Sequence, residues 1–164
     1  MSGLILFPEM PQLEMVLKLV MATLFGGVVG YERELSDKPA GLRTHILVCL
    51  GSALFTLASL FGFGQGSDPA RVAAQVVTGV GFLGAGTILR TGATVRGLTT
   101  AASIWAVAAV GVAVGVGMYL LAVVSTFLVA GVLRFSGKLS SNGDGQKLIC
   151  GEKNSPARHL MKMI

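Results

Sequence analysis

Charged side chains are scarce in this sequence. Only 13% of its 164 residues are Asp, Glu, Lys or Arg, whereas 52% are hydrophobic and the mean hydropathy is +0.73. A water-soluble domain of this size usually carries about 25% charged residues. The shortage excludes an ordinary solvated surface and predicts that lipid surrounds much of the chain. The length allows one domain and little more.

Cysteine and acidic residues within the apolar runs are also few. Cys49 and Cys150 have the spacing neither of a disulfide framework nor of a metal site, and we expect two free thiols. Glu14 lies within an apolar run, with Glu32 and Asp68 at the ends of others. No nucleophile–base set, carboxylate pair or metal-ligand cluster emerges. We therefore expect no enzyme, no bound metal and no cofactor.

Long apolar runs are the main positive feature. A helix that crosses a membrane needs about 20 mostly apolar residues. Inside a bilayer the backbone must satisfy its own hydrogen bonds, so such runs are expected to be helices. The sequence predicts an all-α, polytopic integral membrane protein with five transmembrane helices in residues 13–135. The five segments are 13–30, 44–63, 70–89, 98–115 and 118–135.

The last two segments almost touch. Gly111, Gly115 and Gly117 favour a tight reversal between them, and one continuous long helix is the alternative.

The basic residues predict the orientation of these helices. All 13 except Lys18 and Arg71 lie in the first loop, in the third loop, or at and beyond the end of the fifth segment, and these three places share one side. Lys and Arg favour the cytoplasmic side of a membrane. We therefore expect a short external N-terminus (1–12) and a cytoplasmic tail (136–164), the latter mostly disordered. The same distribution explains the pI of about 9.6 without nucleic acid.

Polar residues lie at the start of the third segment and share one face of the predicted helix. Asp68 is a typical N-cap and Pro69 a typical first helical residue, which is a structural interpretation. It does not explain Arg71 and Gln75, which follow on one helical face at i, i+4. A polar side chain at membrane depth needs a partner. Asp68, Arg71 and Gln75 are therefore a candidate functional face, with a cap plus one structural hydrogen bond as the alternative.

Glycines recur later in the same segment. The spacing G-x-G-x-x-G would suit a dinucleotide only after a strand and before a distant acidic residue, and this context is missing. Small residues instead let membrane helices approach closely. We predict helix-packing positions at Gly79, Gly81, Gly84 and Gly86. Two further G-x-x-x-G pairs are Gly26/Gly30 and Gly111/Gly115.

A polar rim is expected where the first and third loops meet the membrane. One interpretation is that the charged residues set the membrane topology and the hydroxyl groups cap the helices. The other is a charged, hydroxyl-lined vestibule or docking surface, and the sequence leaves both open. The candidate rim residues are Glu32, Arg33, Arg43, Thr99 and Thr100.

Five stretches of the sequence are GYERE (30–34), AGLRTH (40–45), DPARVAAQVV (68–77), GVGFLGAG (79–86) and GLTTAASIW (97–105). Together they resemble the MgtC/SapB family of bacterial inner-membrane proteins. The resemblance covers about residues 15–135 and implies a five-span hydrophobic domain. Longer members carry a cytoplasmic C-terminal domain, and this sequence departs from them there.

The resemblance also implies a role. Some members support growth when Mg²⁺ is scarce, and members of the family act on other membrane proteins, including the proton-driven ATP synthase. We therefore expect a non-enzymatic inner-membrane protein that modulates a partner membrane complex or ion homeostasis. Its partners would be the lipid bilayer and another membrane protein or a second copy of itself. The alternative is a small oligomeric transporter or channel, historically magnesium-related, that uses the Asp68, Arg71 and Gln75 face.

Overall fold

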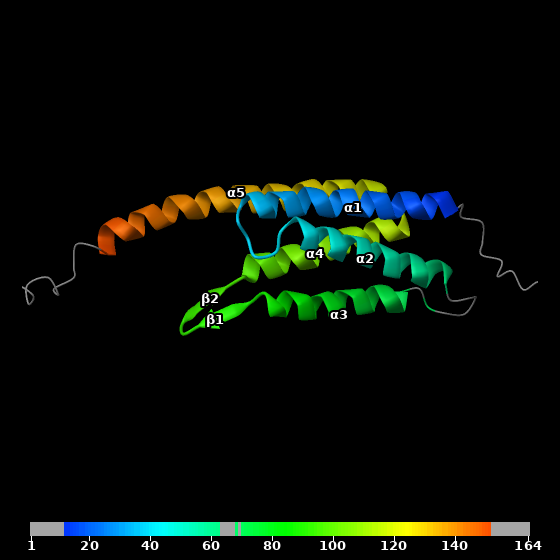
Figure 1. Ribbon diagram of the computed structural model, residues 1–164, viewed down its shortest axis with the longest axis horizontal. Coiled ribbons are helices and arrows are strands. Elements are labelled where there is room, and N and C mark those ends of the chain that lie inside the picture. The colour runs from blue at the N-terminus through cyan, green and yellow to red at the C-terminus, as the bar shows by residue number, and fades with distance from the viewer. Residues whose placement is uncertain (1–11, 63–67, 69, 152–164) are drawn as a thin grey trace, which may run out of the picture.

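Five helices and one short hairpin make up the described part of the chain (Figure 1). The computed structural model describes residues 12–62, 68 and 70–151, with side chains up to Phe135. The expected external segment before residue 12 and the end of the tail after residue 151 lie outside the described residues. The elements are α1 (Gln12–Leu35), α2 (Leu42–Phe61), α3 (Ala70–Gly86), β1 (Leu89–Thr91), β2 (Thr94–Arg96), α4 (Leu98–Val116) and α5 (Tyr119–Gly151).

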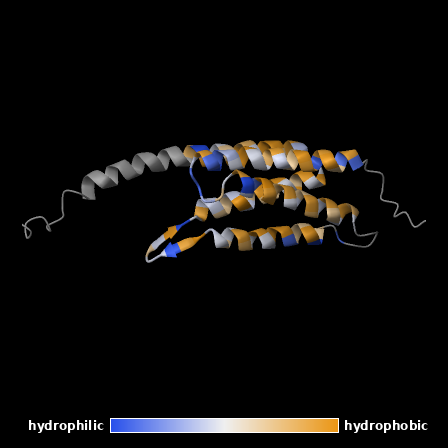
Figure 2. Ribbon diagram, viewed as in Figure 1, coloured by the Kyte–Doolittle hydropathy of each residue, from blue (hydrophilic) through white to orange (hydrophobic). Residues whose placement is uncertain are grey.

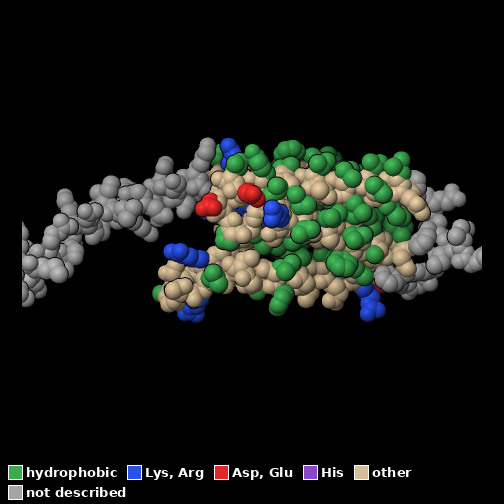
Figure 3. Space-filling view, viewed as in Figure 1, with side chains coloured by type: hydrophobic (Ala, Val, Ile, Leu, Met, Phe, Trp, Pro, Cys, Tyr) green, Lys and Arg blue, Asp and Glu red, His purple; other side chains and the backbone are tan. Residues whose placement is uncertain are grey.

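Hydrophobic residues predominate along the helices (Figure 2), and their side chains cover much of the face shown in the space-filling view (Figure 3). α1, α2 and α4 are each long and apolar enough to cross a membrane, and the Tyr119–Phe135 part of α5 is a shorter apolar helix. Large side chains such as Phe82 and Leu120 are about four-fifths exposed, at 82% and 80%. The helical architecture is confirmed and suits a membrane protein. The count of five spans and their orientation stay predictions.

The chain reverses sharply between α4 and α5. Gly117 has φ +95°, which L side chains rarely adopt, and its N–H donates to the carbonyls of Ala113 and Val114 at 3.1 and 3.0 Å. The predicted reversal is therefore present, and the alternative of one continuous helix is excluded.

Two segments differ from the sequence-based expectation. α3 ends at Gly86, before the predicted residue 89, and the following hairpin was not predicted. The β-branched Thr and Val around Gly92 favour strands and a tight turn there. α5 continues to Gly151, although disorder was predicted from residue 136. Once a helix has formed, each added residue contributes another backbone hydrogen bond, so an existing helix extends easily.

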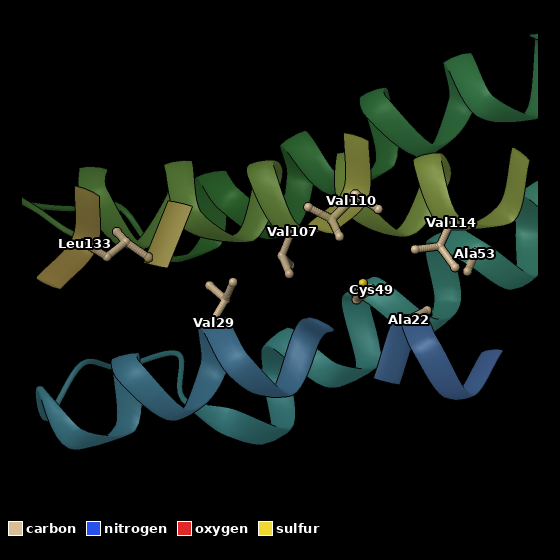
Figure 4. Close-up of a cluster of buried hydrophobic side chains, with 9 residues drawn as sticks. Ala22, Val29, Cys49, Ala53, Val107, Val110, Val114 and Leu133 are labelled. Carbon is tan, nitrogen blue, oxygen red and sulfur yellow. The ribbon is translucent and has the colours of Figure 1, made fainter. Parts of the chain in front are cut away.

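The core lies where α1, α2 and α4 meet, and α5 closes one side of it (Figure 4). Small and β-branched residues fill it, among them Ala22, Val29, Cys49, Val107 and Val110. The backbones approach closely at four glycines, and these are the two G-x-x-x-G pairs. A Cβ at Gly26 would lie 2.7 Å from the His45 carbonyl oxygen, and one at Gly115 would lie 2.7 Å from Thr56 Cβ. A Cβ at Gly30 would lie 2.8 Å from Leu42 Cα, and one at Gly111 would overlap the Cys49 carbonyl oxygen.

α3 is the least enclosed helix of the bundle. It runs beside α2 and α4 on the outside of the molecule (Figure 1), and it buries only Val76, Val80 and Gly84. By contrast, half of the most apolar stretch of α4 is buried.

Candidate functional site

A buried ion pair closes the end of α1. Arg33 Nε donates to Glu32 Oε2 at 2.6 Å, and the two side chains are 3% and 10% exposed. Arg33 Nη2 also donates to the Leu133 carbonyl at 3.2 Å, and Ser36 Oγ donates to Glu32 Oε1 at 3.0 Å. These bonds satisfy both charges and tie α1 to α5. Glu32 and Arg33 therefore lie inside the bundle and not on an open vestibule.

Glu34 caps the next helix. Its Oε2 accepts the N–H of Leu42, the first residue of α2, at 2.8 Å. The first N–H groups of a helix have no partner within the helix and favour a negative charge. A Cβ at Gly41 would lie 2.7 Å from the same oxygen. Glycine at position 41 therefore leaves the space that the carboxylate needs.

His45 joins α2 to α4 by hydrogen bonds at both ring nitrogens. The ring is fully buried, with Nδ1 2.9 Å from the Gly41 carbonyl and Nε2 3.0 Å from Ser103 Oγ. The Gly41 carbonyl can only accept, so Nδ1 carries the hydrogen in that contact. Ser103 Oγ also lies 2.8 Å from the Thr100 carbonyl. Ser103 was not predicted from the sequence, because no local pattern reveals a partner 58 residues away.

The remaining rim residues separate into two environments. Arg43 and Thr99 are exposed, whereas Thr100 is buried and offers its carbonyl to Ser103. The predicted rim therefore divides into two buried polar groups, which include Glu32, Arg33 and Thr100, and the exposed Arg43 and Thr99; its five residues do not form one cluster.

The polar face of α3 begins with the predicted cap. Asp68 Oδ1 accepts the Ala70 N–H at 2.9 Å, and its carbonyl accepts the Arg71 N–H at 3.2 Å. Arg71 and Gln75 are both exposed. No ion pair joins Asp68 to Arg71 among the residues that the structure describes. The three residues thus follow one helix without forming a closed cluster.

A groove of about 550 Å³ separates α2 from α3. Its walls are almost entirely apolar, and Gln75 and Ser52 are its polar side chains. The Ser52 hydroxyl donates to the Val48 carbonyl of its own helix at 2.8 Å, which leaves Gln75 as the amide exposed in the groove. The lining residues include Leu47, Phe55, Val72, Val76, Gly79 and Leu83.

The glycines of α3 behave differently from the prediction. A Cβ at Gly84 would lie 3.6 Å from Ala101 Cβ, which is ordinary contact between α3 and α4. A Cβ at Gly79, Gly81 or Gly86 would meet no atom within 4 Å. These three face open space because α3 packs along one narrow side only. Close packing within this chain therefore does not explain them.

A second polar cluster lies at the other end of the bundle. Lys18 is buried, with Nζ 3.5 Å from Glu14 Oε1 and 3.4 Å from the Gly115 carbonyl. Tyr119 Oη donates to the same Glu14 oxygen at 3.5 Å. A cation near the last carbonyls of α4 is favoured by the helix dipole. This cluster links α1, α4 and α5.

The polar interior is internally satisfied. Among the described residues, every buried side-chain nitrogen or oxygen has a hydrogen-bond partner. The same part of the chain holds no group of three His, Cys, Asp or Glu residues that could bind a metal ion. The open site is therefore the α2–α3 groove, with Gln75 in its wall and Arg71 one helical turn away.

Comparison with known proteins places the chain in a family. The sequence model of the MgtC family matches residues 19–142. A protein of Escherichia coli K12 named "Putative magnesium transporter YhiD" is 46% identical over 134 residues, which are 77% of this chain and 62% of that protein. Protein MgtC of Brucella abortus (strain 2308) is 49% identical and Protein MgtC of Salmonella typhimurium LT2 is 45% identical, each over 114 residues.

Those 114 residues are 70% of this chain and 48% of either MgtC protein. The chain thus spans about half to three-fifths of the length of these curated relatives. No solved structure matches the chain. The match extends over all the stretches that carry the resemblance seen in the sequence, and the chain belongs to the MgtC family.

Proposed function

We propose that this chain is a non-enzymatic, multi-pass protein of the bacterial inner membrane that modulates a partner membrane complex or ion homeostasis, with a link to growth at low magnesium. The observation that carries the proposal is the α2–α3 groove. It is apolar, faces outward from the bundle and holds an exposed amide, Gln75. An apolar helix with one polar residue fits such a groove, since helices in membranes associate by close packing and interhelical hydrogen bonds.

The charges of the bundle support a regulator over a carrier. A pathway for a cation through the membrane needs polar groups that are free to face the ion. Here the Glu32–Arg33 and Glu14–Lys18 pairs are each bonded internally, and they lie at opposite ends of α1. Growth at low magnesium would then depend on a partner protein, for which the ATP synthase is a family-level candidate.

The alternative is a small oligomeric transporter or channel. It is favoured by the name of the Escherichia coli relative, which contains the words magnesium transporter. A pathway would then form between copies of the chain along the Asp68, Arg71 and Gln75 face, because these residues lie at the surface of a single copy.

The experiment combines a flux assay with a matched pair of groove variants. Purified protein in liposomes should move no Mg²⁺ beyond the leak of protein-free liposomes. In cells, Gly79→Leu fills the groove and should abolish the low-magnesium growth that the wild-type gene restores to a deletion strain. Gly81→Leu lies on the same helix, outside the groove lining, and should restore growth. Immunoblots should show equal membrane levels of both variants.

Two results would contradict the proposal. Protein-dependent Mg²⁺ flux would favour the transporter. Full growth with Gly79→Leu at normal protein levels would remove the groove as the functional surface.

The proposed topology is five spans with the N-terminus outside and the C-terminus inside. It rests on the side that most basic residues share. A C-terminal green fluorescent protein fusion should be bright and a C-terminal alkaline phosphatase fusion inactive. The opposite pattern would overturn the orientation.

A further inference from the structure

The β1–β2 hairpin stands clear of the helices at one end of the bundle (Figure 1). It joins the end of α3 to the start of α4, and every residue of both strands is exposed. An isolated two-stranded hairpin is only marginally stable in water. The proposed regulator function assigns it no role.

The base and the tip of the hairpin are both held in place. At the base, Gly97 has φ +89°, and a Cβ there would overlap the Thr87 carbonyl oxygen. Thr87 donates to the Gly84 carbonyl through its N–H at 3.0 Å and its hydroxyl at 2.8 Å. At the tip, Gly92 has φ +61°, and Arg90 Nε donates to its carbonyl at 3.2 Å. The hairpin is therefore presented in a defined position relative to α3 and α4.

The two faces of the hairpin carry the same chemistry. The register pairs Leu89 with Arg96 and Arg90 with Val95. Directly paired residues lie on the same face of a sheet, so each face holds one arginine and one aliphatic side chain. Leu89 is 67% exposed and Val95 is 45% exposed. Residues 87–97 contain no Asp or Glu that could neutralise the two guanidinium groups.

We propose that this hairpin lies in the membrane interface and binds the phosphate groups of anionic phospholipids. It connects the end of α3 to the start of α4, and for two helices that cross a membrane such a connection lies at the level of the lipid headgroups. Guanidinium groups bind phosphate oxygens through paired hydrogen bonds. Aliphatic side chains beside them are covered by the upper part of the acyl chains.

The presence of both side-chain types on both faces favours lipid over a protein partner. A protein surface would cover one face of the hairpin and leave the other arginine–aliphatic pair in water. Lipid surrounds an inserted hairpin on every side. The positive charge without neutralising acids matches the negative surface of a membrane that contains anionic lipid.

A fluorescent label at the hairpin tip tests this position. The protein is prepared with Ala93→Cys and Cys150→Ser, and Cys49 is buried and shielded from the reagent. The nitrobenzoxadiazole-labelled protein is placed in nanodiscs of phosphatidylcholine alone or mixed with phosphatidylglycerol. We expect brighter, blue-shifted emission in the mixed membrane, and a smaller difference at high salt because salt screens surface charge.

Charge variants identify the groups that respond to the anionic lipid. Each arginine at an anionic surface favours binding by about fivefold, so Arg90→Gln with Arg96→Gln should weaken the preference for phosphatidylglycerol about 25-fold. The matched control, Lys38→Gln with Arg43→Gln, removes two exposed charges from the α1–α2 region and should keep the blue shift. Leu89→Gln with Val95→Gln should lower the emission in both membranes. Circular dichroism should show the same helix content in all variants.

Three results would overturn the proposal. The first is equal emission of the parent protein in the two membranes. The second is a label that stays in water in both, which would leave a protein partner as the cover for the hairpin. The third is an equal loss in the two charge variants, which would assign the effect to general basicity and not to the hairpin.

Discussion

Helices α3 and α4 both carry glycines at regular spacing, yet only those of α4 are in close contact with a neighbour. A Cβ at Gly115 would lie 2.7 Å from Thr56 Cβ, whereas one at Gly79 or Gly81 would meet no atom within 4 Å. α4 lies between α1, α2 and α5, but α3 leaves a groove along α2. The same residue type thus serves two purposes. In α4 it brings backbones together, and in α3 it keeps a surface open.

The largest expected difference in stability is between removing a buried charge on α1 and removing an exposed charge on α3. Glu32→Ala should destabilise the protein by about 3–5 kcal/mol, because it leaves the buried Arg33 without its carboxylate partner. Arg71→Gln on α3 removes an exposed charge and should stay within about 0.5 kcal/mol of wild type. Unfolding of the detergent-solubilised proteins, followed by circular dichroism, measures both. Equal losses would show that α3 is as firmly built into the fold as α1.

The glycine contrast gives the next largest effect. Gly111→Ala should cost about 1–3 kcal/mol or more, since its methyl group would meet the α2 backbone at Cys49 and the Ser52 side chain. Gly81→Ala should be neutral or stabilising by up to about 1 kcal/mol, because alanine is the better helix former and the site is open. Unfolding of the detergent-solubilised variants, followed by circular dichroism, measures both changes in stability. Destabilisation by Gly81→Ala would indicate a close contact that one copy of the chain does not contain.

Hydrogen bonds across helices distinguish the regions in the same way. Ser103→Ala leaves Nε2 of the buried His45 without its partner and should cost about 1–3 kcal/mol. The hydroxyl of Thr78 on α3 is exposed and donates to the Ala74 carbonyl of its own helix at 3.3 Å, so Thr78→Ala should change stability by less than about 0.5 kcal/mol. A wild-type melting temperature for Ser103→Ala would contradict the bridging role of His45.

The smallest effect is local to α3. Asp68→Ala removes the N-cap and should cost about 1 kcal/mol. Because α3 packs loosely, we expect faster backbone hydrogen exchange in its first turns and unchanged exchange in α4. Mass spectrometry of the exchanged protein resolves the two helices. A uniform increase across α4 would show that the two helices unfold as one unit.

Much of the fold follows from apolar run length. All five predicted segments contain a helix, because long apolar runs have few other ways to satisfy their backbone. The reversal at Gly117 and the cap at Asp68 also follow from local chemistry that a sequence displays. The hairpin was missed because its strands are only three residues long, too short for an alternating pattern to be visible.

The site was harder to predict because it depends on distant partners. Arg33 contacts the Leu133 carbonyl and His45 contacts Ser103, and neither spacing carries a sequence signal. The glycines show the same limit. Both the G-x-x-x-G and the G-x-G-x-x-G spacing are typical of helices that pack closely. Which of the glycines contact another helix depends on where the neighbouring helices lie. Arg71 and Gln75 lie on one helix and Asp68 caps its start, as the sequence indicated, yet the groove beside Gln75 depends on the position of α2.

Because α3 is the least enclosed helix, the chain can be divided into a core of α1, α2 and α4 and a segment that connects α2 to α4. α4 docks directly on α2, so the segment from α3 through the hairpin behaves as a long insertion between two neighbours. The entropy of closing a loop grows only slowly with its length, by about 0.6 kcal/mol per doubling. Lengthening or shortening this insertion therefore changes little in the α1–α2–α4 core.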